Sequence, residues 1–441
     1  MGSLVIGLGK TGASCVRYLA ARGEAVAATD TRRDPPGLAA LGELAGRIPL
    51  RLGGLDPSSL DGVTRVLMSP GLSLEEPIVR AARERGIEVL GDIELFARDV
   101  RAPVIGVTGT NGKSTVTSLV AHMAAAAGRR VLAGGNLGEP ALDLLAHPVP
   151  DLYVLELSSF QLETTSSLAL AGAVVLNVTA DHMDRYASFE AYARAKERIY
   201  AHATTVVLNA DDPVVAAMRP EGARALTFSV HGAAADFTLL HEGGVTWLAR
   251  DGRRLVETSR MKLAGTHNAA NALAALALGE AAGLPYPAML QALESFPGLA
   301  HRSAWVADIG GVRYVDDSKG TNVGATIAAV EGLGGPLVLI AGGQAKGQDF
   351  TPLAAALRGR VRHAVLIGQD AALLGAALSE ACSCEFAASM PAAVAAAAAA
   401  ARPGEVVLLS PACASLDMFR DYNHRGDVFA ASVRNLAGAA R

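Results

Sequence analysis

The sequence predicts an α/β protein with three domains, each built around a mainly parallel, Rossmann-like sheet. Strand-like runs alternate with helix-like runs along almost all of the 441 residues, a pattern typical of parallel sheets covered by helices. The length suggests about three domains. Strand-like runs also end in glycines at residues 4–9, 103–109 and 336–343. We expect each of these runs to be the first strand of a nucleotide-binding type of sheet.

Composition and charge indicate large apolar cores and a reducing compartment. Hydrophobic residues make up 51% of the chain, and the net charge is −4 without a basic tail, which argues against nucleic acid as a main partner. The four cysteines lack zinc-type spacing and are too few for a disulfide framework. The first strand is expected from Leu4, leaving no room for a signal peptide, and no apolar run is long enough to span a membrane. We expect a cytoplasmic monomer without membrane insertion.

The first predicted domain, residues 1–93, carries a glycine-rich turn between its first strand and first helix. Gly7, Gly9 and Gly12 have the spacing G-x-G-x-x-G, and Asp30 ends the second predicted strand. In this context the spacing predicts a turn that binds a diphosphate, with Asp30 on a ribose hydroxyl. The residues alone leave open whether the ligand is NAD or a nucleotide sugar, or whether the turn is purely structural.

The second predicted domain, residues 94–297, contains a phosphate-binding loop. A glycine-rich turn at residues 109–112 leads into Lys113 and Ser114 at the start of a helix pattern. Backbone N–H groups in such a turn cradle an anion, the lysine reaches the β- and γ-phosphates, and the serine hydroxyl ligates Mg²⁺. We therefore expect a nucleoside triphosphate site, although Val107 stands where the common spacing has a glycine.

The same domain is expected to hold a small antiparallel insert at about residues 228–256. Strand-like runs at residues 246–248 and 254–256 flank Asp251 and Gly252, a dipeptide that favours a hairpin turn.

Acidic residues follow two predicted core strands of this domain. Glu156 stands at the end of one strand, either as an acid beside Mg²⁺ or as a solvated strand end. Asp181, His182 and Asp184 form a loop after the next strand, which suits a second cation or a purely structural histidine. Lys196 lies in a helix pattern, and its position alone indicates a solvent-facing lysine.

Further polar residues fall near and within the third predicted domain, residues 298–441. Asn268 precedes an alanine-rich helix and is either its N-cap or a nucleotide contact. Residues 316–322 are dense in charge and hydroxyl groups, which suits a polar site between domains or a plain turn. Lys346, which follows the third glycine-rich turn, also suits such a polar site. Ser415 follows a strand and is available for an anion, while Cys413 has no histidine nearby in the sequence and is expected to be inert.

Together these motifs resemble the Mur ligases of bacterial cell-wall synthesis. The resemblance rests on TGTNGKST (108–115), LELSSFQLE (155–163), NVTADHMDRY (177–186), DDSKGTN (316–322) and SPACASLD (410–417). It covers essentially the whole chain in collinear order. The last motif and residues 91–96 favour the branch of the family that adds D-glutamate.

The resemblance implies a reaction and a division of labour. It implies an ATP-dependent amide ligase that adds D-glutamate to UDP-N-acetylmuramoyl-L-alanine through an acyl phosphate, in peptidoglycan precursor synthesis. The first domain would bind UDP, so the turn at residues 7–12 would hold the diphosphate of UDP and not NAD. The second would be the ATPase, with two Mg²⁺ ions. The third would bring the amino acid.

The resemblance also assigns roles to single residues. For UDP these are Lys10, Thr11, Asp30, Thr31, Arg32 and Ser69. Near the muramoyl-peptide end they are Asn136, Ser158 and Gln161. For ATP they are Gly109, Thr110, Asn111, Gly112, Lys113, Ser114, Thr115, Asn268, Arg302, Asp317 and Lys319. For D-glutamate they are Thr321, Lys346, Ser415 and Tyr422.

The implied metal ligands are Ser114, Glu156, His182 and a carbamylated Lys196, and the implied catalytic residues are Lys113, His182 and Lys196. Four positions depart from the family pattern. Gln344 and Ala345 precede Lys346 where the family more often has Asp-Gly, Tyr422 stands in place of Phe, and Lys10 replaces an apolar residue.

Three other functions are weighed against the ligase. An NAD-dependent oxidoreductase would use the first glycine-rich turn but leave the phosphate-binding loop unexplained. A nucleotide-binding regulatory module would need no Glu156 and His182 pair. A sibling ligase is the nearest alternative, although a folylpolyglutamate-type synthetase would have no evident use for the first domain.

Overall fold

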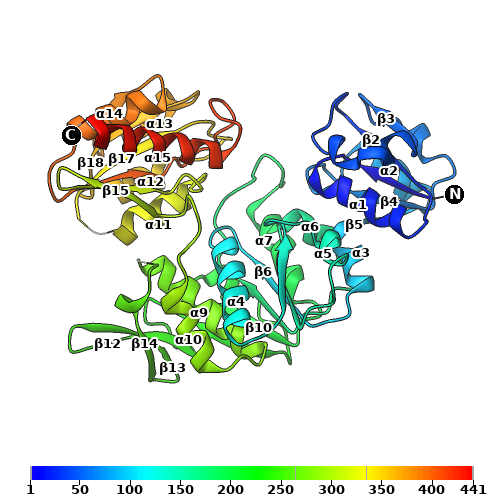
Figure 1. Cartoon of the computed structure of the whole chain (residues 1–441), viewed down its shortest axis with the longest axis horizontal. Helices are drawn as coiled ribbons and strands as arrows, with labels where there is room; N and C mark the ends of the chain where they lie inside the picture. The colour runs from blue at the N-terminus through cyan, green and yellow to red at the C-terminus, as the bar shows by residue number, and fades with distance from the viewer. Residues whose placement is uncertain (1, 264, 334, 440–441) are drawn as a thin grey trace.

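The computed structural model describes residues 2–263, 265–333 and 335–439, and it confirms the predicted architecture of three α/β domains with mainly parallel sheets. Figure 1 shows the first domain (blue) and the third domain (yellow to red) on opposite sides above the middle domain (cyan to green). The boundaries at residues 93 and 297 remain predictions. Near them, the first sheet ends at Gly91 and the second begins at Val104, while the last middle-domain helix ends at Ser295.

The first domain is a parallel sheet of order β3-β2-β1-β4-β5 with helices around it. Its strands are β1 (Ser3–Ile6), β2 (Val26–Asp30), β3 (Leu50–Leu52), β4 (Arg65–Met68) and β5 (Glu88–Gly91). Its helices are α1 (Lys10–Ala21) and α2 (Pro77–Glu84), with 3-10 turns at Ala39–Gly46 and Pro57–Leu60, and α3 (Asp92–Asp99) leads into the middle domain. The glycine-rich turn lies between β1 and α1, as predicted.

The middle domain has a mixed sheet of order β14-β13-β12-β11-β10-β9-β6-β8-β7. Its strands are β6 (Val104–Thr108), β7 (Val131–Gly135), β8 (Leu152–Glu156), β9 (Gly172–Val175), β10 (Thr205–Asn209), β11 (Arg224–Phe228), β12 (Phe237–Glu242), β13 (Val245–Arg250) and β14 (Arg253–Glu257). Its helices are α4 (Lys113–Ala126), α5 (Ala141–Leu144), α6 (Ser159–Glu163), α7 (Phe189–Glu197), α8 (Pro213–Ala216), α9 (Thr266–Ala281) and α10 (Tyr286–Ser295), with 3-10 turns at Arg198–Tyr200 and Thr258–Arg260.

The predicted antiparallel insert is confirmed as strands β12 to β14, which extend one side of this sheet. Asp251 (φ +48°) and Gly252 (φ +72°) form the turn between β13 and β14. Two successive residues with positive φ are what a tight hairpin of right-handed twist requires.

The third domain has the order β15-β16-β20-β17-β18-β19, with β15 antiparallel to β16. Its strands are β15 (Ala304–Ile309), β16 (Val312–Asp316), β17 (Leu337–Gly342), β18 (Val361–Ile367), β19 (Ser383–Phe386) and β20 (Val406–Leu409). Its helices are α11 (Val323–Leu333), α12 (Thr351–Leu357), α13 (Ala371–Leu378), α14 (Met390–Ala400) and α15 (Tyr422–Ala439). The prediction that residues 336–343 contain a first strand is wrong, because β15 and β16 precede β17 in this sheet.

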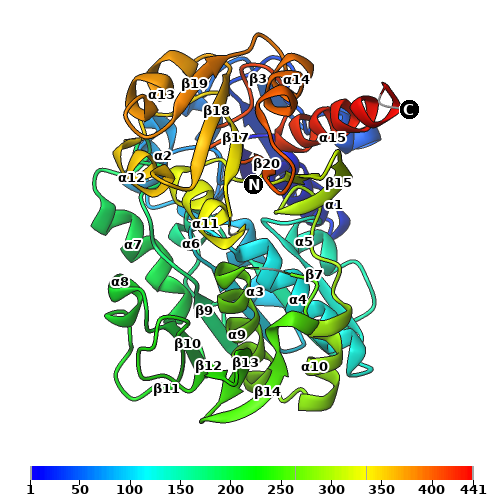
Figure 2. The ribbon, with the colours of Figure 1, turned by 90° about the vertical axis from the view of Figure 1, so that its left-hand side faces the viewer.

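The middle domain has a deeply buried core on both faces of its central strands. All five residues of β6 are buried, and in α9 the side chains from Ala272 to Leu278 are at most 1% exposed. The small alanines let α9 pack closely against the sheet and against α4. Within the described part of the chain, no helix is long and apolar enough to cross a membrane. Figure 2 shows how the third domain lies above the middle domain, so that α11 comes down close to α9.

Candidate active site

The phosphate-binding loop connects β6 to α4 and is held in place by the strand beside it. Gly109 (φ +148°) and Gly112 (φ +84°) have backbone conformations that side chains rarely adopt. A Cβ at Gly112 would also lie only 2.4 Å from Asn271 Oδ1. Just after β9, Asn177 accepts hydrogen bonds from the loop, with its carbonyl from the N–H of Thr110 (2.9 Å) and with its side chain from the N–H of Asn111 (2.8 Å).

Two lysines lie against this loop, Lys113 partly buried and Lys196 fully buried. Lys113 Nζ donates to the carbonyls of Gly109 and Thr110, both at 2.8 Å. Lys196 Nζ donates to the same Gly109 carbonyl at 2.9 Å and lies 4.4 Å from the centroid of the Tyr192 ring. The interpretation of Lys196 as a solvent-facing lysine is therefore wrong, because α7 turns this side chain inward and leaves it 2% exposed. Burial, together with the charge of Lys113, lowers the pKa of Lys196 well below its ordinary value.

A carboxylate and a hydroxyl meet at the base of the loop. Ser114 Oγ donates to Glu156 Oε2 at 2.5 Å, and Asn136 Nδ2 donates to Glu156 Oε1 at 2.6 Å. Glu156 is 3% exposed, so its interpretation as a solvated strand end is wrong. Among the residues that the structure describes, no three His, Cys, Asp or Glu side chains form a metal-binding group. At the predicted cation position, the structure brings together the hydroxyl of Ser114 and the carboxylate of Glu156.

His182 belongs to a separate loop that faces the same region. It has a positive φ of +58°, and its ring packs 5.0 Å from the Phe160 ring and 3.8 Å from the Asp181 carboxylate. Burial lowers its pKa, and the charges of Lys196, Lys346 and Lys113 lower it further, while Asp181 opposes them. The lowered pKa favours the neutral imidazole at neutral pH. Within the described hydrogen bonds, His182 makes no contact with Glu156.

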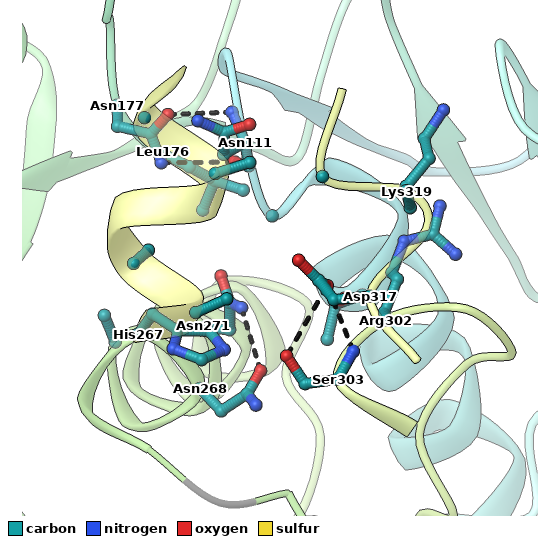
Figure 3. Close-up of a pocket in the computed structure, with 18 of the residues that line it drawn as sticks. Asn111, Leu176, Asn177, His267, Asn268, Asn271, Arg302, Ser303, Asp317 and Lys319 are labelled. Atoms are coloured by element: carbon teal, nitrogen blue, oxygen red, sulfur yellow. Dashed lines mark hydrogen bonds between the residues drawn. The ribbon is translucent and has the colours of Figure 1, made fainter. Parts of the chain in front are cut away.

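A cavity of about 290 Å³ lies between the middle and third domains (Figure 3). The phosphate-binding loop and α9 line it from one domain, and residues around β16 and α11 line it from the other. Its polar residues include Asn111, Thr115, Asn177, His267, Asn268, Asn271, Arg302, Ser303, Asp317 and Lys319. Its apolar residues include Leu176, Phe228, Leu263, Leu299, Ala325, Ala328 and Ala329.

Asn268 reaches this cavity from inside α9. The helix begins at Thr266 after Gly265, so the interpretation of Asn268 as the N-cap is wrong. It is buried, and Asn271 Nδ2 donates to its Oδ1 at 3.3 Å. Figure 3 shows this amide pair across the cavity from Arg302 and Lys319.

The cavity concentrates positive charge. Burial lowers the pKa of Lys319 to about 8, and the charges of Arg302 and Lys113 contribute to this lowering. Burial also lowers the pKa of Lys113, partly opposed by Glu156 and Asp181. Cations that disfavour one another in this way become more stable when a polyanion binds among them.

Asp317 adds a protonatable group to the same wall. Its Oδ2 accepts from Ser410 Oγ at 2.7 Å and its Oδ1 from the Ser303 N–H at 3.0 Å. Burial nevertheless raises its pKa to about 7. At neutral pH this carboxyl can therefore either accept or donate a hydrogen bond.

The six residues predicted for UDP lie in the first domain and do not line this cavity. Lys10 and Thr11 begin α1, Thr31 and Arg32 follow β2, and Ser69 follows β4, so they gather where parallel strands end. The carboxylate of Asp30 accepts hydrogen bonds from the Leu8 N–H at 2.7 Å and from the side chain of Arg32 at 2.7 and 2.8 Å. Burial opposes its charge, but these hydrogen bonds lower the pKa of Asp30 to about 2. Lys10 Nζ bonds to the carbonyl of Gly138 in the middle domain.

The residues predicted for the muramoyl-peptide end lie near Glu156. Asn136 contacts Glu156 directly, whereas Ser158 and Gln161 form a capping box at the start of α6. Gln161 Nε2 also donates to the buried carboxyl of Asp92 at 3.0 Å.

The residues predicted for D-glutamate come from separate loops of the third domain. Thr321 follows the 316–320 segment, Lys346 is exposed with φ +51°, Ser415 is buried, and Tyr422 begins α15. Lys319 Nζ lies 3.9 Å from the centroid of the Tyr422 ring, so the two predicted pockets adjoin.

Sequence reasoning missed three asparagines that organise the site. Asn177 holds the loop, Asn271 pairs with Asn268, and Asn322 reaches the loop from the third domain. Asn177 and Asn322 lie inside motifs already singled out, and Asn271 stands one helical turn after Asn268. Helical spacing was therefore the available signal for Asn271.

The chain matches three family models in collinear order. These are Mur ligase MurD-like, N-terminal domain over residues 2–91, Mur ligase middle domain over residues 107–279, and Mur ligase, glutamate ligase domain over residues 301–413. Among solved structures, the UDP-N-acetylmuramate-alanine ligase MurC of Thermotoga maritima superposes with a TM-score of 0.63 at 20% identity, covering 99% of both chains. The pseudomurein peptide ligase type C of Methanothermus fervidus superposes with a TM-score of 0.62 at 18% identity, covering 100% of both chains.

Curated relatives match over the full length. The UDP-N-acetylmuramoylalanine--D-glutamate ligase of Nitrosococcus oceani is 55% identical over 437 residues, which cover 98% of this chain and 96% of that protein. The relative of the same name in Pseudomonas aeruginosa is 49% identical over 439 residues, covering 98% of each. Identity at this level across all three domains shows that the chain belongs to the Mur ligase family.

Proposed function

We propose that the protein is an ATP-dependent ligase that adds D-glutamate to UDP-N-acetylmuramoyl-L-alanine in peptidoglycan precursor synthesis. The full-length relatives named above carry this reaction in their name and share 49% and 55% of their residues with this chain. The products would be ADP, inorganic phosphate and the UDP-linked dipeptide. We place the reaction in the cytoplasm and assign it to the monomer.

The observation that carries this proposal is the convergence of partly buried cations on the phosphate-binding loop and on the cavity beside it. Lys113 lies within the loop, and Arg302 and Lys319 face it from the third domain. Burial and mutual repulsion lower the pKa of both lysines, so a triphosphate would supply the charge that the site lacks. Leu263, Leu299 and the alanines of α11 give this cavity apolar lining, against which the base would pack.

The donors beside the loop fit a magnesium ion. Mg²⁺ prefers oxygen ligands and keeps several waters, so the Ser114 hydroxyl and the Glu156 carboxylate form a sufficient protein ligand set. A Mg²⁺ ion held by these two residues would offset the repulsion between the triphosphate and an approaching carboxylate. For a second ion we propose His182, whose neutral ring is the form that binds metals.

We propose that Lys196 is carbamylated and provides the anionic oxygen for that second ion. Its buried amine has a pKa lowered by burial and by Lys113, which favours the neutral form that attacks CO₂. A nitrogen–carbon bond forms between the neutral amine and CO₂, one proton leaves, and the amine becomes a carbamate anion. The adjacent Lys113 would stabilise this new charge.

The chemical steps follow from these charges. The L-alanyl carboxylate attacks the γ-phosphorus of ATP, and ADP leaves an acyl phosphate behind. Lys113 stabilises the negative charge that builds up on the transferred group. The neutral amine of D-glutamate then attacks the acyl carbon, and the tetrahedral intermediate expels phosphate. A base must take the amine proton. His182 is the candidate, but a neutral ring has a single unprotonated nitrogen, so this role competes with binding of the second ion.

The two other substrates would bind on either side of this centre. We propose that the strand ends of the first domain hold UDP through Lys10, Thr11, Asp30, Thr31, Arg32 and Ser69, with Asn136, Ser158 and Gln161 near the peptide end. Lys346, Thr321 and Ser415 would anchor the carboxylates of D-glutamate beside Tyr422. Closing the third domain over these groups would keep water away from the acyl phosphate.

Isotope transfer tests the proposed chemistry directly. UDP-N-acetylmuramoyl-L-alanine labelled with ¹⁸O in its carboxylate is incubated with ATP, Mg²⁺ and D-glutamate. An acyl phosphate leaves one labelled oxygen in each released phosphate, because the carboxylate oxygen that attacked phosphorus departs with it. Phosphate without label, formed in step with the amide product, would contradict the acyl phosphate.

A further inference from the structure

Asn322 joins the third domain to the phosphate-binding loop. Its Nδ2 donates to Asn111 Oδ1 at 3.1 Å, and Asn111 Nδ2 returns a longer contact to Asn322 Oδ1 at 3.5 Å. Asn322 Nδ2 also lies 3.3 Å from Asp181 Oδ2, in the loop that carries His182. Asn322 is 4% exposed, so these contacts are made away from bulk water, where an unpaired amide would be costly.

The same side chain caps α11. Asn322 Oδ1 accepts from the N–H of Ala325 at 2.8 Å, the position that an N-cap satisfies. One amide therefore caps the start of a helix in the third domain and also binds the loop of the middle domain. A shift of Asn111 would therefore disturb the first turn of α11.

From α11 the hydrogen bonds continue to the pocket proposed for D-glutamate. Gln348 Oε1 accepts from the N–H of Val323 at 2.9 Å. Gln348 Nε2 donates to the carbonyl of Ala345, next to Lys346, at 3.0 Å, and to the carbonyl of Ala412, in the segment of Ser415, at 3.1 Å. Gln348 thus ties the start of α11 to both loops of that pocket.

The face of α11 toward the middle domain is shaped for close approach. A Cβ at Gly324 would lie 3.2 Å from Thr179 Oγ1, and one at Gly332 would lie 2.8 Å from His267 Nδ1. Figure 3 shows the helix running along the cavity from Asn111 to His267. The two glycines let α11 rest on the middle domain at both ends, so its position depends on the groups it touches there.

We propose that Asn322 is a positioning residue that, through α11 and Gln348, couples the phosphate-binding loop to the amino-acid pocket. The inference rests on the proposed function for the identity of the two ligands. When the loop is arranged around ATP, Asn111 keeps its hydrogen bond to Asn322, and α11 stays in contact with the middle domain. Gln348, bonded to the start of α11, then holds the loops of Lys346 and Ser415 in place. Binding in one site then favours binding in the other, and by linkage the effect is mutual.

Substitutions at Asn322 separate the contact to the loop from the helix cap. Asn322→Ser keeps a good N-cap but is too short to reach Asn111, and Asn322→Ala loses both. If Asn322 positions the pocket, both variants raise the KM for D-glutamate roughly threefold to tenfold, the range of one or two lost hydrogen bonds. The KM for UDP-N-acetylmuramoyl-L-alanine stays unchanged. Asn322→Asp keeps the cap and brings a carboxylate to Asp181, so it is expected to be worse than serine.

A matched control removes a helix cap elsewhere in the same domain. Ser389 caps α14 by accepting from the N–H of Ala392, away from the cavity. Ser389→Ala should lower stability without moving any KM. If Asn322→Ser has the KM values of the unmodified protein while Asn322→Ala does not, Asn322 is only a cap and the proposal is overturned.

Amide exchange gives a second measurement that does not depend on turnover. Without substrates, Asn322→Ser should speed deuterium uptake in a peptide covering residues 107–113 by roughly threefold or more, while α11 keeps its protection. Unchanged uptake in that peptide would overturn the coupling even if the KM for D-glutamate were raised. If the unmodified protein shows no turnover with D-glutamate, the proposed function fails, and the exchange result alone decides the role of Asn322.

Discussion

At the residue scale, the site is defined by amines that the fold keeps from water. Lys113 and Lys196 both donate to the carbonyl of Gly109, so two ammonium groups share one acceptor beneath the loop. Burial lowers the pKa of both amines, and the charge of Lys113 lowers the pKa of Lys196 further. An arrangement this unfavourable in isolation is typical of functional sites, where a ligand supplies the missing charge.

Lys113 gives the first prediction. Lys113→Ala should lower kcat roughly 100- to 1,000-fold, because the charge that stabilises phosphoryl transfer is removed from a site where water cannot replace it. Binding of UDP-N-acetylmuramoyl-L-alanine, measured by calorimetry without ATP, should be unchanged because that substrate is assigned to another domain. Near-normal turnover in this variant would remove Lys113 from the mechanism.

Lys196 gives the second. Lys196→Ala should lose at least roughly 100-fold in kcat and recover part of it when short carboxylic acids such as acetate are added, because they can supply the missing anion. Lys196→Arg is the matched control, since a guanidinium keeps a positive charge and leaves no room for an added acid. An alanine variant that turns over like the unmodified protein would exclude the carbamate.

At the element scale, helix α3 anchors the first domain to the middle one. Glu94 in α3 is 2% exposed and accepts from the N–H groups of Ser166 and Ser167 at 2.8 and 2.9 Å, and from Ser167 Oγ at 2.8 Å. These hydrogen bonds lower its pKa to about 2. The charged carboxylate therefore fixes the segment that follows α6 in place.

This anchor gives the third prediction. A lowered pKa means that the stabilisation is complete above the ordinary glutamate pKa of about 4.3 and is lost as the pH falls from there toward 2. Glu94→Gln should lower the free energy of unfolding by about 1–3 kcal/mol at pH 7, measured by urea denaturation. The difference from the unmodified protein should shrink at pH 3.5. A difference that is the same at both values would mean that the charge of Glu94 is not what stabilises the contact.

Elements defined by residues that are neighbours in the chain could be predicted from the sequence, whereas those that depend on distant contacts could not. The phosphate-binding loop was predictable because its glycines, lysine and serine are neighbours in the chain, and the β13–β14 hairpin because Asp251 and Gly252 favour positive φ. Lys196 was misread because its burial depends on how α7 packs against Gly109, 87 residues away. The pairing of Asn322 with Asn111 spans 211 residues and is set by how two domains meet.

Two local misreadings have local causes. Asn268 was considered an N-cap because the alanine run begins after it, but Gly265, with φ +96°, starts the helix earlier. The strand β17 was expected to open its sheet because it ends in glycines, but the β15–β16 hairpin comes first, and Asp317, directly after β16, lines the cavity.

At the scale of the whole molecule, the proposed function divides the ligands among the three domains. The strand ends of the first domain carry the residues proposed for UDP, the middle domain carries the phosphate-binding loop, and the third faces that loop with Arg302 and Lys319. The cavity at the junction exists only because the middle and third domains meet there (Figure 3). Turnover should therefore require all three substrates, and the choice of amino acid should lie in the third domain.

The most direct test of this account is phosphate release from ATP with Mg²⁺ and UDP-N-acetylmuramoyl-L-alanine, measured with D-glutamate, L-glutamate, L-lysine or meso-diaminopimelate and without any amino acid. The account predicts release with D-glutamate alone, in step with amide formation. Release with a different amino acid would keep the ligase chemistry but contradict the assignment of the third-domain pocket, and no release with any of them would contradict the proposed reaction itself.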